Sequence, residues 1–181
     1  MLHQVQSATN NLVAFINDTY NPLLQEIEEN RQELLAIFNK KTIQATADNN
    51  LYLSLASKLI EELNTMLSYR KETVIPYLHT LAKKVAEGHN CSSCSGKCNL
   101  PHQTIVQMLM DDITKTREHL YRMYKVAKPN LFELQNDQID YKAVRIIMHS
   151  MELNVLQLLF FDEYELINFT KDGQVQIYAH A

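Results

Sequence analysis

The sequence predicts an all-α fold, an up-down-up-down four-helix bundle with long helices that forms a single domain over residues 1–181. The 181 residues include only three glycines, four prolines and no tryptophan, which leaves few natural breaks in a helix. Apolar residues recur every three or four positions through four long stretches, and short polar segments separate these stretches. A chain of this length has a large enough hydrophobic fraction, 46%, to bury one substantial core.

The first two stretches predict long helices that each contain a proline. Residues 3–40 follow a helical spacing interrupted only at Asn21-Pro22, so we expect one helix with a proline kink or two collinear pieces. Residues 51–88 predict a second helix that Pro76 should bend. Gly88 is expected to end this helix, because glycine adopts the left-handed conformation that follows a helix at little cost.

The last two helices are predicted from their caps and their apolar spacing. Asn99 is a suitable cap and Pro101 a suitable first-turn residue for a third helix that runs to about Ala127. A fourth helix is expected from about Ile139 into the 160s. The tail, residues 167–178, alternates polar and apolar residues around Asp-Gly, which is typical of a small terminal hairpin; a ragged extension of the fourth helix is the alternative.

The fourth helix carries two apolar seams on roughly opposite sides. One seam is Val144, Ile147, Met151, Val155 and Leu158, and the other is Ile146, Leu153, Leu156 and Phe160. A four-helix bundle covers only one side of each helix, so the second seam predicts a homodimer through the fourth helix, with His149 in the middle of the interface. Cover by the chain's own tail is the alternative.

Charge and composition exclude several functions. Seventeen basic and twenty-one acidic residues give a net charge of −4, and the absence of a basic face argues against nucleic acid as a partner. The N-terminus lacks the pattern of a signal peptide, and no uninterrupted apolar run approaches the roughly 20 residues that span a bilayer. We therefore expect a cytoplasmic protein without a membrane partner.

No glycine-rich elbow, phosphate loop or nucleophile triad is present in the sequence. The sequence therefore predicts no catalytic residue and leaves open whether the protein is an enzyme.

All three cysteines and two of the seven histidines lie within residues 89–102. Cys91 and Cys94 have the spacing that brings two thiolates onto one ion, and Cys98 follows closely. Either His89 or His102 completes a tetrahedral zinc site with three cysteines and one histidine. An iron–sulfur site and a metal-free loop are the alternatives.

The helices hold a second set of candidate ligands, His79, His119, His149 and Glu152. Inward-facing histidines and carboxylates are how helical bundles hold di-iron centres. Two of these histidines have a carboxylate on the same helix, His79 with Glu72 and His119 with Asp112. In each pair the two residues are two helical turns apart, about 10 Å along the axis, which is too far for both side chains to bind one ion. We therefore expect surface or boundary residues here, with His149 in an interface.

The run from Tyr69 to His89 also resembles a known family. It contains Pro76-Tyr77-Leu78, then Leu-Ala-Lys-Lys-Val at 81–85, then His89, and it resembles the corresponding helix of hemerythrin-like proteins, especially the di-iron group that repairs iron–sulfur clusters. Residues 148–154 resemble that group's final His and Glu motif. The resemblance implies a four-helix bundle, non-haem iron with His89 as a ligand, and a role in oxygen, nitric oxide or iron handling. Met66-Leu67 stands where the family carries a histidine pair, which implies a relative that has lost much of the di-iron site.

Three functional hypotheses follow. The first is a non-catalytic metal-binding bundle whose Cys/His loop holds zinc or responds to redox conditions. The second is a di-iron protein of hemerythrin type. The third is a helical dimer that acts as an interaction scaffold and makes no use of its cysteines.

Overall fold

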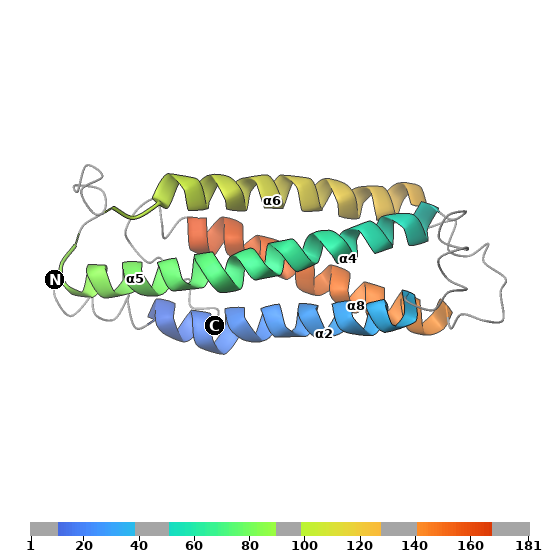
Figure 1. Cartoon of the computed structure of the whole chain (residues 1–181), viewed down its shortest axis with the longest axis horizontal. Helices are drawn as coiled ribbons and strands as arrows, with labels where there is room; N and C mark the ends of the chain where they lie inside the picture. The colour runs from blue at the N-terminus through green and yellow to red at the C-terminus, as the bar shows by residue number, and fades with distance from the viewer. Residues whose placement is uncertain (1–10, 39–50, 90–98, 128–140, 168–181) are drawn as a thin grey trace. The chain divides into compact units, whose positions relative to one another are not determined.

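The computed structural model describes residues 11–38, 51–89, 99–127 and 141–167, and these residues form the predicted up-down-up-down four-helix bundle (Figure 1). Within these ranges every regular element is helical. The predicted terminal hairpin lies outside the described residues, and Ile167, the last of them, is still in a helix.

The four long helices are continuous along the chain but change their winding locally. Residues 11–15 are helical and lead into a π-helical turn, η1 (Ile16–Tyr20), and then α2 (Asn21–Phe38). The second helix consists of α4 (Leu51–Tyr69), the π-helical η2 (Arg70–Val74) and α5 (Ile75–Ala86). The third is α6 (His102–Arg122) followed by η3 (Met123–Ala127), and the fourth is α8 (Tyr141–Phe160) followed by η4 (Phe161–Leu166).

The chain divides into two compact units, and each unit takes one stretch of each of the four helices. Unit 1 comprises Met1–Leu23, Ser68–Ile113 and Gln157–Ala181, and unit 2 comprises Leu24–Leu67 and Thr114–Leu156. The core of unit 1 includes Ile16, Val74, Leu78, Leu81, Ile105, Leu109, Leu158 and Leu166. The core of unit 2 includes Leu24, Ile27, Leu34, Leu59, Leu63, Met148, Met151 and Val155. Each such side chain contributes roughly 1.5–3 kcal/mol by leaving water, so each unit has an apolar core of its own.

Two of the π-helical turns come directly before a proline. The backbone N–H of Asn21 bonds to the carbonyl of Ile16, and that of Ile75 bonds to the carbonyl of Arg70, so both bonds span five residues. Pro22 and Pro76 follow immediately, and each lacks the N–H that would continue the ladder. The proline interruption expected from the sequence therefore takes the form of one widened turn within a continuous helix.

Gly88 ends the second helix as predicted. Its φ of 91° is left-handed, its N–H bonds to the carbonyl of Val85 at 3.0 Å, and the N–H of His89 bonds to the carbonyl of Lys84 at 2.9 Å. These two bonds are the Schellman arrangement, which closes a helix end and fixes the residue after the glycine. The position of His89 is thus set by the way α5 ends.

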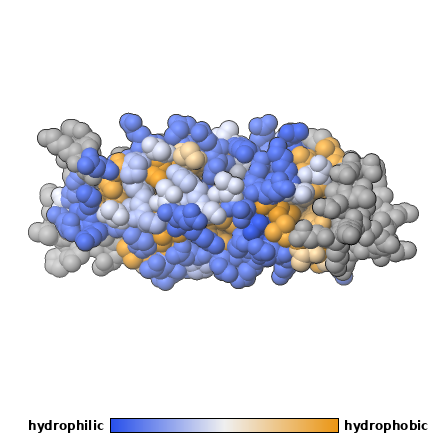
Figure 2. All heavy atoms as spheres, viewed as in Figure 1, coloured by the Kyte–Doolittle hydropathy of each residue, from blue (hydrophilic) through white to orange (hydrophobic). Residues whose placement is uncertain are grey.

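The two seams of the fourth helix face different environments. Val144, Met151, Val155 and Leu158 are buried, whereas Ile147 is half-buried. Ile146, Leu153, Leu156 and Phe160, which make up the second seam, are all exposed. In the view of Figure 2, hydrophilic residues cover most of the described surface, with apolar residues visible between them.

The stretch Lys142–Leu166 is long and apolar enough to cross a membrane by length and composition alone. The core helix of a soluble protein passes the same test, so this is weak support for a span. Charged residues such as Arg145 and Glu152 interrupt the stretch, which is why the sequence shows no uninterrupted apolar run there.

Candidate functional site

His89 and His102 flank the cysteine segment, and both belong to unit 1. His89 follows the Schellman turn at the end of α5, and His102 is the first residue of α6. Asn99, just before α6, has a φ of 53°, and the carbonyl of Pro101 accepts a hydrogen bond from the N–H of Ile105 at 3.0 Å. Cys91, Cys94 and Cys98 lie outside the described residues, so the structure locates the two histidines and not the thiols.

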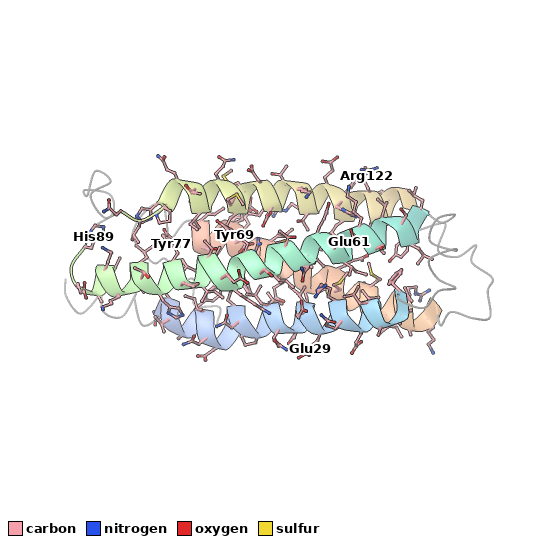
Figure 3. All side chains as sticks on the ribbon, viewed as in Figure 1. Glu29, Glu61, Tyr69, Tyr77, His89 and Arg122 are labelled. Atoms are coloured by element: carbon pink, nitrogen blue, oxygen red, sulfur yellow. The ribbon has the colours of Figure 1, made fainter. Side chains whose placement is uncertain are left out.

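Tyr77 fixes the ring of His102. The phenolic oxygen of Tyr77 and Nδ1 of His102 are 2.6 Å apart, and the two rings meet edge to face with centroids 5.6 Å apart. Tyr77 is buried on α5, whose C-terminal end lies just before His89 (Figure 3). The contact therefore ties the start of α6 to α5 and directs Nε2 of His102 away from the phenol.

The environment of His102 favours its neutral form. Burial lowers the pKa of His102 below its ordinary value, and the positive charge of the nearby His89 ring lowers the pKa further. Neutral imidazole is the form that binds metal ions.

His89 has a buried ring nitrogen without a hydrogen-bond partner. Its Nε2 atom is shielded from solvent and makes no hydrogen bond with any residue that the structure describes. A buried nitrogen in this state costs roughly 1–3 kcal/mol relative to a paired one. A ring nitrogen of neutral imidazole can accept a hydrogen bond or bind a metal ion.

The second set of candidate ligands does not converge. His79 and His149 are exposed, and Glu152 is half-buried. In the part of the chain that the structure describes, no group of three or more His, Cys, Asp or Glu side chains could hold a metal ion. These residues therefore remain candidates from the sequence alone.

His119 is buried in unit 2, where it joins two helices. Nδ1 of His119 lies 3.0 Å from a carboxylate oxygen of Glu62, and Nε2 lies 2.8 Å from the carbonyl oxygen of Leu55. Lys115 and Lys58 approach the other oxygen of the Glu62 carboxylate at 3.4 and 3.9 Å. Both nitrogens of the His119 ring are engaged by protein groups, so this histidine is part of the packing between helices.

Unit 1 also contains a buried polar cluster that was not predicted from the sequence. The phenol of Tyr20 donates a hydrogen bond of 2.6 Å to Asp162, and the guanidinium of Arg70 donates to the same carboxylate through Nε, at 3.1 Å, and through Nη2. Nη1 of Arg70 donates to Asp112 at 2.8 Å. Tyr20, Arg70 and Asp162 are completely buried, and all three lie in π-helical turns.

Burial and charge act together on this cluster. Burial raises the pKa of Tyr20 well above 10.0, and the negative charge of Asp162 adds to the rise. For Arg70, burial acts to lower the pKa, but the carboxylate of Asp162 outweighs it and holds the pKa above its ordinary value. The side chains thus form a neutral phenol and a paired guanidinium and carboxylate, a hydrogen-bonded group with a structural role.

The positions of Arg70 and Asp162 in the apolar pattern could have predicted this cluster. Arg70 occupies a core position between Leu67 and Val74, and Asp162 occupies one between Leu158 and Leu166. Opposite charges at core positions of two helices indicate a buried ion pair.

Comparisons of the whole chain with protein-family models, with curated proteins and with solved structures found no match.

Proposed function

We propose that this chain is a metal-binding helical-bundle protein in which the segment between α5 and α6 holds one zinc ion through Cys91, Cys94, Cys98 and His89. The observation that carries the proposal is the buried Nε2 of His89, which has no hydrogen-bond partner among the described residues and lies two residues before the first of three closely spaced cysteines. Zinc would act non-catalytically, by joining the end of α5 to the start of α6.

The donor set suits zinc. Thiolate and imidazole are the ligands of structural zinc sites, and three cysteines with one histidine complete a tetrahedral shell. Cys91 and Cys94 have the spacing that places two thiolates on one ion. Thiolate ligands would also make binding sensitive to reagents that modify thiols, which is the basis for a redox-responsive role.

Two features favour His89 over His102 as the fourth ligand. Within the described ranges Nε2 of His89 has no competing hydrogen bond, whereas Tyr77 already holds the ring of His102. The Schellman turn also fixes the backbone of His89 immediately before the cysteine segment. His102 is then a neighbour whose lowered pKa limits the positive charge beside the zinc ion.

Metal analysis of the full chain, purified without an affinity tag, tests the proposal. Elemental analysis after incubation with zinc and dialysis should give one zinc per chain, and a thiol reagent should release it. The Cys91→Ser, Cys94→Ser double variant should lose the metal. His79→Asn is the matched control, because it removes an exposed histidine of α5 outside the proposed site and should retain one zinc per chain.

Three results would overturn the proposal. Absence of bound zinc in the unmodified protein would favour the interaction-scaffold hypothesis. Two irons per chain with visible charge-transfer absorption would favour a di-iron centre of hemerythrin type. Full zinc content in the double cysteine variant would place the metal elsewhere.

A further inference from the structure

The outward side of α8 presents an apolar face that no described residue covers. We define the α8 outer face as Ile146, His149, Leu153, Leu156 and Phe160, all of which are exposed. The exposed fractions of Ile146 and Leu153 are 59% and 54%. Single exposed apolar residues are common on protein surfaces, but a row of them along one helix marks an interaction site.

The spacing of this face indicates what kind of surface it fits. Its members follow one another at intervals of three, four, three and four residues. This spacing is typical of the seam of a two-helix coiled coil, in which side chains of one helix insert between those of the other. Another α-helix is therefore a better match than a flat surface or a bilayer, and the imidazole of His149 within the stripe also disfavours lipid.

The distribution of charge along this helix favours a second copy of the same helix in the antiparallel orientation. The basic residues Lys142 and Arg145 lie near the start of α8. The acidic residues Glu163 and Glu165 lie in η4, which continues the helix at its other end. In an antiparallel pair of identical helices, the basic end of each lies beside the acidic end of the other. A parallel pair would instead place Lys142 of one copy beside Lys142 of the other, and like charges in contact are unfavourable.

We propose that a second copy of this chain docks on the α8 outer face, with the two helices antiparallel around a two-fold axis near Leu153. In this arrangement Leu153 of each copy packs near Leu156 of the other, and Arg145 lies near the partner copy's acidic end at Glu163. A two-fold axis makes the face self-complementary, as a symmetric dimer requires. The proposal does not depend on zinc binding.

Sedimentation analysis of the full chain over a range of concentrations tests the dimer. The unmodified protein should dimerise reversibly, and Leu153→Glu should raise the dissociation constant by roughly a hundredfold or more, because the buried leucine is lost from both copies. Tyr121→Glu is the matched control: Tyr121 is an exposed apolar residue of α6 outside the face, so this variant should dimerise normally. Circular dichroism should show that both variants keep their helical content.

A charge-swap series tests the antiparallel direction. Arg145→Glu and Glu163→Arg should each weaken the dimer by roughly tenfold, and the double variant should restore it. Because these residues are 18 positions apart on one helix, about 27 Å, they cannot compensate each other within one chain. Single variants that both weaken the dimer without restoration in the double variant would overturn the antiparallel arrangement.

Other occupants of the face would give different results. If the chain's own tail covers it, the protein stays monomeric at every concentration, which overturns the proposal. If a bilayer covers it, the monomeric chain sediments with phosphatidylcholine vesicles and Leu153→Glu does not, which also overturns it. A dimer that Leu153→Glu leaves unchanged would place the interface on another surface.

Discussion

Tyr20 and Asp162 are 142 residues apart in sequence and are joined by a buried hydrogen bond of 2.6 Å. The same carboxylate receives the guanidinium of Arg70, so one acidic side chain of the fourth helix links the first and second helices within unit 1. This group is the main polar feature of the core of unit 1, and it makes definite predictions about stability.

Arg70→Met should lower the free energy of unfolding by about 3–5 kcal/mol, because it leaves the Asp162 carboxylate buried without its cation. Asp112→Asn is the control: the Asp112 side chain is 27% exposed, and its loss should cost less than about 1 kcal/mol. Urea unfolding followed by circular dichroism measures both values. A cost for Arg70→Met no larger than that of the control would contradict a structural role for the pair.

Tyr20 should make the protein less stable in alkali. Burial, followed by the charge of Asp162, raises the pKa of Tyr20 in the folded chain above the unfolded value near 10.0. Its contribution is therefore complete below pH 10 and is lost as the pH rises above it, by up to about 1.4 kcal/mol per pH unit, since only the unfolded phenol ionises. The free energies of unfolding of the wild type and Tyr20→Phe should converge between pH 10 and 11, and parallel curves would contradict the prediction.

His119→Leu should destabilise the protein by roughly 1–3 kcal/mol, because the carbonyl oxygen of Leu55 and a carboxylate oxygen of Glu62 each lose the ring nitrogen that contacts them. His79→Leu removes an exposed histidine and should change stability by less than about 0.5 kcal/mol. Thermal unfolding of the two variants under the same conditions compares them directly. Equal effects would mean that the buried position of His119 contributes nothing.

Gly88→Ala should cost about 1–2 kcal/mol through backbone strain alone. The φ of Gly88 is 91°, and a Cβ placed there would meet no atom within 4 Å, so steric crowding adds nothing. Gly88→Asn should cost less than Gly88→Ala, since asparagine tolerates left-handed conformations better. Chemical unfolding of both variants gives the order, and the reverse order would contradict the assignment of strain.

Removal of zinc should destabilise the unmodified protein and leave the Cys91→Ser, Cys94→Ser variant unaffected. A ligand that binds only the folded state adds about 2.7 kcal/mol at a free concentration one hundred times its dissociation constant. Thermal unfolding with and without a chelator measures the difference. His89→Asn should weaken zinc binding more than His102→Asn does, and the opposite order would assign the fourth ligand to His102.

Much of the fold could be predicted from the sequence because it depends on local patterns. Apolar spacing predicted the four helices, and Gly88 marked a helix end through its own backbone preference. The partners of Arg70 and His119 could not be predicted, because they depend on the register between helices far apart in sequence. For the candidate site, the sequence shows which residues are able to bind a metal ion. The burial of Nε2 of His89 without a hydrogen bond to any described residue could not be predicted, because it depends on three-dimensional packing.

The widened turn η2 has a consequence for how the second helix tolerates changes in length. A π-helical turn contains one residue more than an α-helical turn, and one residue corresponds to about 100° of rotation around the axis. Deleting a single residue between Arg70 and Val74 would let the backbone relax to regular α-helical winding, with the side chains on both sides keeping their orientation, whereas the same deletion within α4 or α5 would rotate one side relative to the other by about 100°. The second helix should therefore tolerate the loss of a residue at η2 better than in α4 or α5, where the same loss would turn either Arg70 away from Asp162 or Leu78 and Leu81 away from the apolar interior.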